Sequence, residues 1–169
     1  MRADEQGQFR DELNRSFGER GIGWKLRDPD GIVFRGGPAF SAVTSQAVHI
    51  LAATGRITAS SKIQEALADI SRKPPDVTGA MQHSIAALEC VARNVRGDAN
   101  ATLGALLPKL DLPKPLDTAV EKLWGFASNR ARHLKEGNII ADEQAELTVT
   151  IACAVCIFLA KKDRSPEWS

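Results

Sequence analysis

The chain has 169 residues, of which 43% are hydrophobic and 25% charged, and its 22 Lys and Arg residues nearly balance its 21 Asp and Glu residues. This composition is that of a folded domain, and it excludes both a disordered chain and a protein coated with basic residues for nucleic-acid binding. A near-neutral total still leaves room for one compact cationic site.

Neither a leader nor a membrane segment is expected. No apolar run follows the first residues, and the three cysteines form an odd, sparse set that favours a reducing cytoplasm. The longest uncharged stretch, 147–160, is shorter than the roughly 18–20 residues that span a bilayer, so it predicts a buried core helix and no membrane association. Cys153 and Cys156 have redox spacing but lie in this helix, without the strand or the further ligands that a redox or zinc site needs. We therefore expect core thiols, no metal and no cofactor.

The first part of the chain predicts a helix, a β-hairpin and a second helix. Apolar residues recur every four positions over 8–20 and indicate an amphipathic helix. Two short apolar runs, 24–26 and 32–34, flank turn-forming residues, as is typical of a hairpin. Helical spacing resumes over 40–55.

The rest of the chain predicts a helical bundle. Helices are expected over 58–70, 76–96, 103–110, 116–127 and 142–162. The expected N-caps are Thr58–Ser61, Asp76 and Asp142, and Gly97 is expected to end the long second helix. The predicted fold is mainly α, a helix and short β-hairpin followed by a helical bundle, divided into residues 1–55 and 56–169.

A basic segment at 128–135 has residues suited to phosphoryl chemistry. It holds three cations, one histidine and no acidic residue, and helical spacing would place Asn129, Arg132 and His133 on neighbouring faces. A guanidinium can hold phosphate oxygens while an imidazole moves a proton near neutral pH, which suits metal-independent RNA cleavage by the 2′-hydroxyl. The other interpretation is a solvated basic helix end.

One acidic residue stands out in the long helix. Glu89 lies close to the apolar stripe, where an unpaired charge would be costly, so a cationic partner is expected. Arg132 or Arg130 is the expected partner, either in a structural pair or to orient the Arg-His unit. His83 lies near the same helix face and is a candidate supporting residue.

Several of these stretches resemble a known family. They are similar, in order and spacing, to bacterial proteins with HEPN-like helical domains related to the AbiJ-type abortive-infection proteins. The matching stretches are Gly79–Arg93, Thr102–Gly104, Lys122–Asn129 and Arg132–His133. The earlier region from Phe9 to Phe34, with Leu13-Asn14, Phe17 and Trp24, resembles the segment that precedes that domain in the same group.

The resemblance implies a helical bundle, often homodimeric, in bacterial phage defence, and many members are metal-independent RNases. The RNase signature is an Arg, then roughly four to six residues, then a His, often with Asn after the Arg. None of this chain's three histidines has an Arg at that distance. Before His133, Asn129 stands where the signature Asn could stand, but Ser128 occupies the Arg position.

Two functions follow as hypotheses. The favoured one is a non-catalytic helical interaction or dimerisation module of a cytoplasmic defence protein, binding a second copy, a partner protein or a nucleotide-bearing ligand. The alternative is a metal-independent RNase or toxin acting on RNA in a dimeric cleft. In that case His133 is the acid and base, Arg132, Arg130 and Lys135 bind phosphate, and Asn129 orients them.

Overall fold

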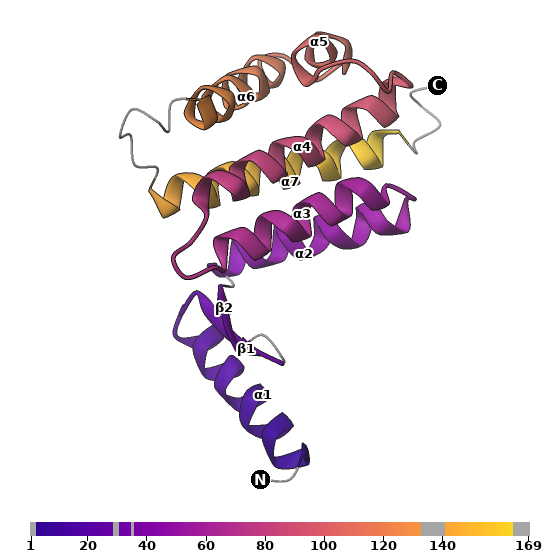
Figure 1. Ribbon diagram of the computed structural model, residues 1–169. Coiled ribbons are helices and arrows are strands. Elements are labelled where there is room, and N and C mark those ends of the chain that lie inside the picture. Colours follow the sequence, from indigo (N-terminus) through magenta and orange to yellow (C-terminus); the bar gives the residue numbers. More distant parts are fainter. Residues whose placement is uncertain (1–2, 29–30, 35, 133–140, 164–169) are drawn as a thin grey trace.

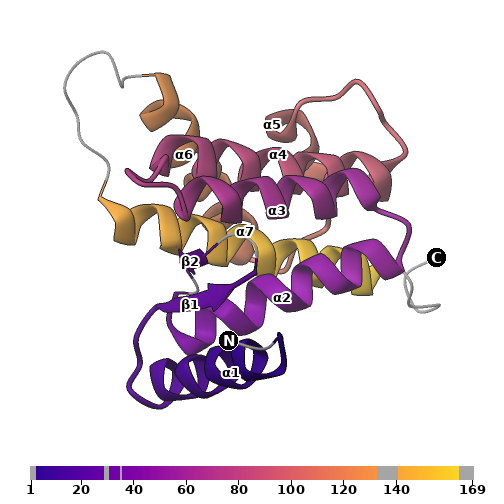
Figure 2. The same ribbon diagram turned by 60° about the horizontal axis from the view of Figure 1, so that its bottom comes forward.

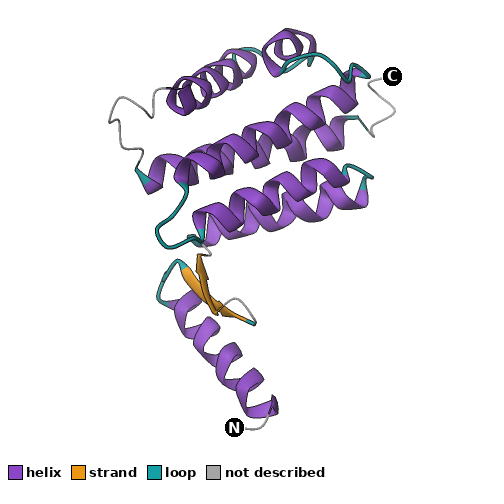
Figure 3. Ribbon diagram, viewed as in Figure 1, coloured by secondary structure: helices purple, strands orange, loops and turns teal. Residues whose placement is uncertain are grey.

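A computed structural model describes residues 3–28, 31–34, 36–132 and 141–163, and the side chains at 3–4, 34 and 130–132 are outside the description. Within these ranges the chain forms seven α-helices, one short 3-10 helix and a two-stranded antiparallel sheet (Figure 3). The predicted mainly helical fold, with a helix and hairpin first, is confirmed.

The N-terminal unit consists of α1 (Ala3–Glu19), β1 (Trp24–Arg27) and β2 (Gly31–Phe34). It projects from the bundle in Figure 1. The Asn14 side chain joins helix to hairpin, because its Nδ2 donates to the Leu26 carbonyl at 2.9 Å and its Oδ1 accepts from the Leu26 N–H at 2.7 Å. One amide thus satisfies both backbone groups of a residue in a strand that would otherwise leave them open.

Four helices form the bundle: α2 (Pro38–Ala53), α3 (Ile57–Ile70), α4 (Val77–Arg96) and α7 (Asp142–Lys162). Neighbouring helices pack in the order α2, α3, α4, α7 and back to α2, and α3 also touches α7 across the bundle (Figures 1 and 2). The buried apolar side chains cluster between these helices and under the cover formed by α5 (Leu103–Leu106), η1 (Leu107–Lys109) and α6 (Leu116–Arg132). Helix α6 packs on α4.

Small residues on α4 bring it close to its neighbours. Ala80, Ser84, Ala87 and Val91 are fully buried, and the packing between α3 and α4 is the most extensive between any two described elements. A helix face made of small side chains lets two helix backbones come close and still fill the space between them.

The helix caps agree with the sequence only in part. Asp76 caps α4 by accepting the Gly79 N–H at 2.8 Å, and Gly97, at φ 64°, ends that helix, both as predicted. The caps predicted at Thr58–Ser61 and Asp142 are wrong. Helix α3 starts at Ile57 after Arg56, and Asp142 is the first residue of α7, after Ala141.

The early start of α3 has a structural cause. Arg56 is 8% exposed, and its guanidinium pairs with Asp163, just beyond the end of α7. This contact fixes the α2–α3 turn, so the hydroxyls that follow fall inside the helix. Helix α2 packs on α3 and α7, and the boundary expected at residue 55 stays a prediction.

Helix α7 contains the apolar stretch predicted as a core helix. Among the described residues, α7 alone has the length and hydropathy of a membrane span. Of its apolar 18-residue stretch, 56% is buried in the bundle, as in a core helix of a soluble protein. The predicted core thiols are confirmed, since Cys153 and Cys156 are buried. Burial raises the pKa of Cys153 to about 12 and raises that of Cys156 strongly, so both stay protonated near neutral pH.

Candidate functional site

The basic segment is only partly described. Asn129 is exposed in the C-terminal part of α6, and the backbone of Arg130 and Arg132 continues that helix. Their side chains, and the whole of His133 and Lys135, lie outside the described residues. The predicted Arg-His site therefore stays a prediction.

Glu89 has partners other than the expected ones. Its Oε1 lies 2.6 Å from the Nη2 of Arg93, one helical turn along α4, and its Oε2 accepts the Leu103 N–H at 2.9 Å. Arg93 in turn donates from Nε to the Ala101 carbonyl at 2.8 Å. The pair fastens the α4–α5 connection onto α4, so the structural interpretation of Glu89 is supported, with Arg93 in the place expected for Arg132 or Arg130.

His83 lies in a polar network between α3 and α4. Its Nδ1 is 2.7 Å from Oδ2 of Asp69, and its Nε2 is 3.1 Å from Oε2 of Glu65. The Asp69 side chain is only 4% exposed and also pairs with Arg72 at 3.2 Å. A methyl group at Gly79 would lie 2.6 Å from Oδ2 of Asp69, so the close approach of α4 requires glycine there.

This network has the charges of a catalytic site but borders neither of two cavities found among the described residues. Neither cavity is lined by His83, Asp69 or Glu65. A hydrogen bond from Lys62 lowers the pKa of Glu65, which keeps that carboxylate charged. The arrangement cross-links two helices. Across the described ranges, no group of three or more His, Cys, Asp or Glu side chains could hold a metal ion.

The feature that sequence reasoning missed is an open apolar stripe on α7. The stripe consists of Leu147, Ile151, Ala154 and Phe158, spaced four, three and four residues apart. Leu147 is 58% exposed and Phe158 38%, Ala154 is exposed and Ile151 half-buried. This spacing keeps side chains on one helix face and is that of a helix–helix seam.

Charge along α7 is arranged by sign. Asp142 and Glu143 lie in its first turn, and Lys161 and Lys162 lie in its last. Each pair suits the partial charge of the helix end where it lies. It also gives the stripe an acidic end and a basic end.

Comparison with protein-family models, with curated proteins and with solved structures finds no match for this chain. Function has to be argued from the geometry. Glu89 and His83 are not brought together, since one bonds toward α5 and the other toward α3. The α7 stripe is the described feature in which two exposed large apolar side chains, Leu147 and Phe158, share one helix face.

Proposed function

We propose that this chain is a non-catalytic helical dimerisation module, which pairs with a second copy through the α7 stripe. The observation that carries the proposal is the exposure of Leu147 and Phe158 on a helix whose other faces form the core. Large apolar side chains gathered in one exposed stripe are typical of a surface that another protein covers.

The stripe is complementary to itself. In an antiparallel pair of α7 helices with a two-fold axis near residues 152–153, Leu147 lies opposite the Phe158 of the second copy. Ile151 then lies opposite the small Ala154, which lets the helices come close. The same symmetry sets Glu143 opposite the second copy's basic last turn, with Lys162 at the paired position and Lys161 beside it, so acidic and basic side chains face each other at both ends. A second copy is therefore the occupant that this surface fits best.

The biological setting that we propose is bacterial phage defence in the cytoplasm, as a HEPN-like, AbiJ-related domain. Support comes from the resemblance of Gly79–Arg93, Thr102–Gly104 and Lys122–Asn129, which fall on α4, the start of α5 and α6. The mainly helical bundle is the kind of fold that the resemblance implies. Expression in a phage-challenged bacterial host tests this setting, and the plaque count should fall with the wild-type chain and recover with a monomeric variant.

Sedimentation of the full chain over a concentration series tests the dimer directly. Wild type should sediment as a dimer and Leu147→Glu as a monomer, because a carboxylate would be buried in the seam. Ile57→Glu, at another exposed apolar residue, is the matched control and should stay dimeric. A monomeric wild type at all concentrations would refute the dimer.

A charge-reversal pair checks the direction of the helices. Glu143→Lys should weaken the dimer because it meets the second copy's basic turn, and adding Lys161→Glu should restore it. If the double variant is weaker than the single one, the antiparallel register is wrong.

The second candidate function is metal-independent RNA cleavage by the 128–135 segment. It is favoured by the exposure of Asn129 on α6, directly before the Arg-rich turn, and by the three cations in this segment. Wild type and His133→Ala would be incubated with tRNA and mRNA in the presence of EDTA. This candidate requires cleavage by wild type that the variant loses; equal cleavage by both, or none by wild type, removes it.

A further inference from the structure

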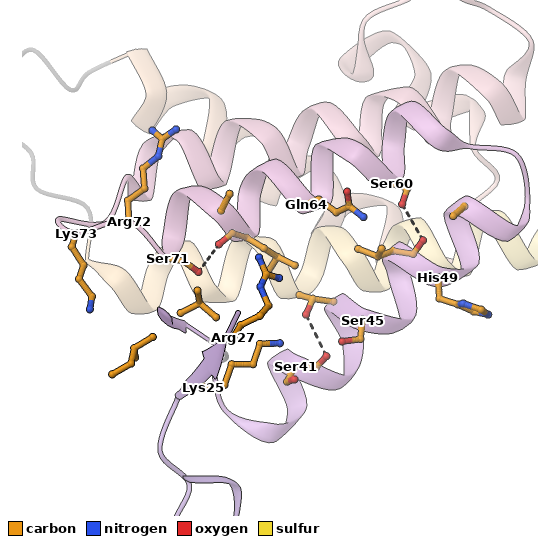
Figure 4. Close-up of a pocket in the computed structure, with 17 residues that line it drawn as sticks. Lys25, Arg27, Ser41, Ser45, His49, Ser60, Gln64, Ser71, Arg72 and Lys73 are labelled. Carbon is orange, nitrogen blue, oxygen red and sulfur yellow. Dashed lines mark hydrogen bonds between the residues drawn. The ribbon is translucent and has the colours of Figure 1, made fainter. Parts of the chain in front are cut away.

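A groove between the hairpin, α2 and α3 collects positive charge without acidic residues. Its volume is about 1070 Å³, and Lys25, Arg27 and Lys73 stand at its hairpin end (Figure 4). Among the described residues that line it there is no Asp or Glu. Arg72 also borders the groove but points away in Figure 4, and it pairs with Asp69 and Asp76.

The fold holds these cations in place from two directions. Lys25 and Arg27 are alternate residues of β1, so their side chains leave the strand on the same face. Lys73 follows α3, and its Nζ lies 5.8 Å from the ring centroid of Trp24, at the start of β1. Cations from the hairpin and from the α3–α4 connection therefore line the same groove.

The other end of the groove is different in character. There it runs between α2 and α3 past aliphatic and small polar side chains, with no further cation among the residues described. The lining residues toward this end include Val48, His49, Ala52, Ser60 and Gln64. Such a surface suits an uncharged organic group with a few hydrogen-bonding atoms.

We propose that this groove binds a phosphate-bearing small molecule of nucleotide size, with its phosphates at Lys25, Arg27 and Lys73 and its organic part between α2 and α3. The volume is slightly above the range of small-molecule pockets, about 300–1,000 Å³, so a nucleotide would fit with room to spare. A long nucleic acid would need cations along its whole track, whereas here they occupy one end. Helix α7 lines no part of the groove, so this site is separate from the proposed dimer surface.

Thermal unfolding and calorimetry of the full chain test the site, with AMP, ADP, ATP, adenosine, pyrophosphate, a short single-stranded RNA and an acidic peptide as probes. A ligand that binds the native state raises the unfolding temperature in a concentration-dependent way. ADP or ATP should do so at roughly millimolar concentration, and adenosine should bind more weakly. Failure of every nucleotide, or clearly tighter binding of the RNA or the peptide, would overturn the proposal.

Variants identify the groove as the place of binding. Lys25→Gln with Arg27→Gln should weaken ATP by roughly tenfold or more, equivalent to about 1.4 kcal/mol. Lys109→Gln with Lys122→Gln removes the same charge from exposed sites in η1 and α6 and should leave binding unchanged. If both double variants lose affinity for ATP equally, the effect is one of general charge, and the proposed site is wrong.

A third variant separates the two ends. Ala52 is exposed and lines the groove at α2, so Ala52→Trp should fill the organic end without disturbing the core. The substitution should weaken the binding of ATP more than the binding of pyrophosphate. If both weaken equally, the organic part does not lie between α2 and α3. The dimer test is independent of these results, because it does not involve the groove.

Discussion

The helical bundle and the α1–hairpin unit are held together in different ways. In the bundle, side chains such as Leu51, Ile63, Leu88 and Leu159 are fully buried between helices. In the N-terminal unit, none of the described side chains from residue 5 to residue 33 is buried. A few polar contacts, chiefly those of Asn14 with β1, join α1 to the hairpin there.

This difference teaches which parts of the chain can tolerate change. Burial contributes roughly 25 cal/mol per Å² of apolar surface, so the bundle gains stability from many atoms at once. The hairpin unit depends on a handful of hydrogen bonds, each with a net value of about 1 kcal/mol. We expect the bundle to unfold as one unit and the hairpin unit to open locally at a lower free energy.

The largest expected effect is in the bundle core. Leu88→Ala removes a fully buried side chain from the middle of α4, where the packed helices cannot collapse, and should lower the free energy of unfolding by about 2–5 kcal/mol. Urea unfolding followed by helical circular dichroism measures this. Ile57→Ala, at a side chain that is 63% exposed, should change it by less than about 0.5 kcal/mol. Similar losses of unfolding free energy in the two variants would mean that core burial does not dominate the stability of the bundle.

Alkaline pH gives the next effect, through the buried thiols. Burial raises the pKa values of Cys153 and Cys156 in the native chain. Above pH 9.0, the ordinary pKa of a cysteine thiol, the unfolded chain therefore loses these two protons while the native chain keeps them. Stability is therefore complete below pH 9 and falls as pH rises toward about 12, by up to about 1.4 kcal/mol per pH unit for each thiol. Urea unfolding at a series of pH values measures the slope.

The control for this prediction is a variant without the two thiols. Cys153→Ala with Cys156→Ala should be less stable at neutral pH, because small cavities remain, but its stability should fall less steeply above pH 9. An unchanged slope would assign the alkaline loss to other groups.

A smaller effect is expected at the polar network of α3 and α4. His83→Ala leaves the buried Asp69 with one partner fewer and should lower the free energy of unfolding by about 1–3 kcal/mol. His49→Ala, at an exposed histidine of α2, is the matched control and should be neutral within about 0.5 kcal/mol. Thermal unfolding of the two variants decides the point, and His83→Ala melting like wild type would show that the network is not structural.

Sequence patterns located the elements well where local chemistry decides them. The hairpin, the cap at Asp76 and the end at Gly97 depend on neighbouring residues alone. The start of α3 could not be predicted, because Arg56 is fixed by Asp163, which is distant in the sequence. The partner of Glu89, by contrast, is local. Arg93 lies four residues along the same helix, a spacing that itself indicates an ion pair.

The candidate sites show the same limit. The apolar run of α7 predicted burial on all sides, whereas only its four-three-four spacing, read alone, could have indicated the open stripe. The cationic groove joins Lys25 and Arg27 to Lys73 across a turn, a helix and a loop. No local pattern connects them, because they come from separate elements that border the groove only in the folded chain.

The smallest global effect, and the sharpest test of the contrast between the two regions, is expected at Asn14. Asn14→Ala removes both hydrogen bonds to Leu26, so amide hydrogen exchange at β1 should speed up by roughly tenfold or more, since about 1.4 kcal/mol corresponds to a factor of ten. The melting temperature of the bundle should move by less than about 2 °C, because no core contact is lost. Gln8→Ala, at an exposed amide of the same helix that bonds only within α1, should leave exchange at β1 unchanged. If Asn14→Ala lowers bundle melting as much as Leu88→Ala does, the hairpin unit is part of the cooperative core, and the groove that it borders would then be as rigid as the bundle itself.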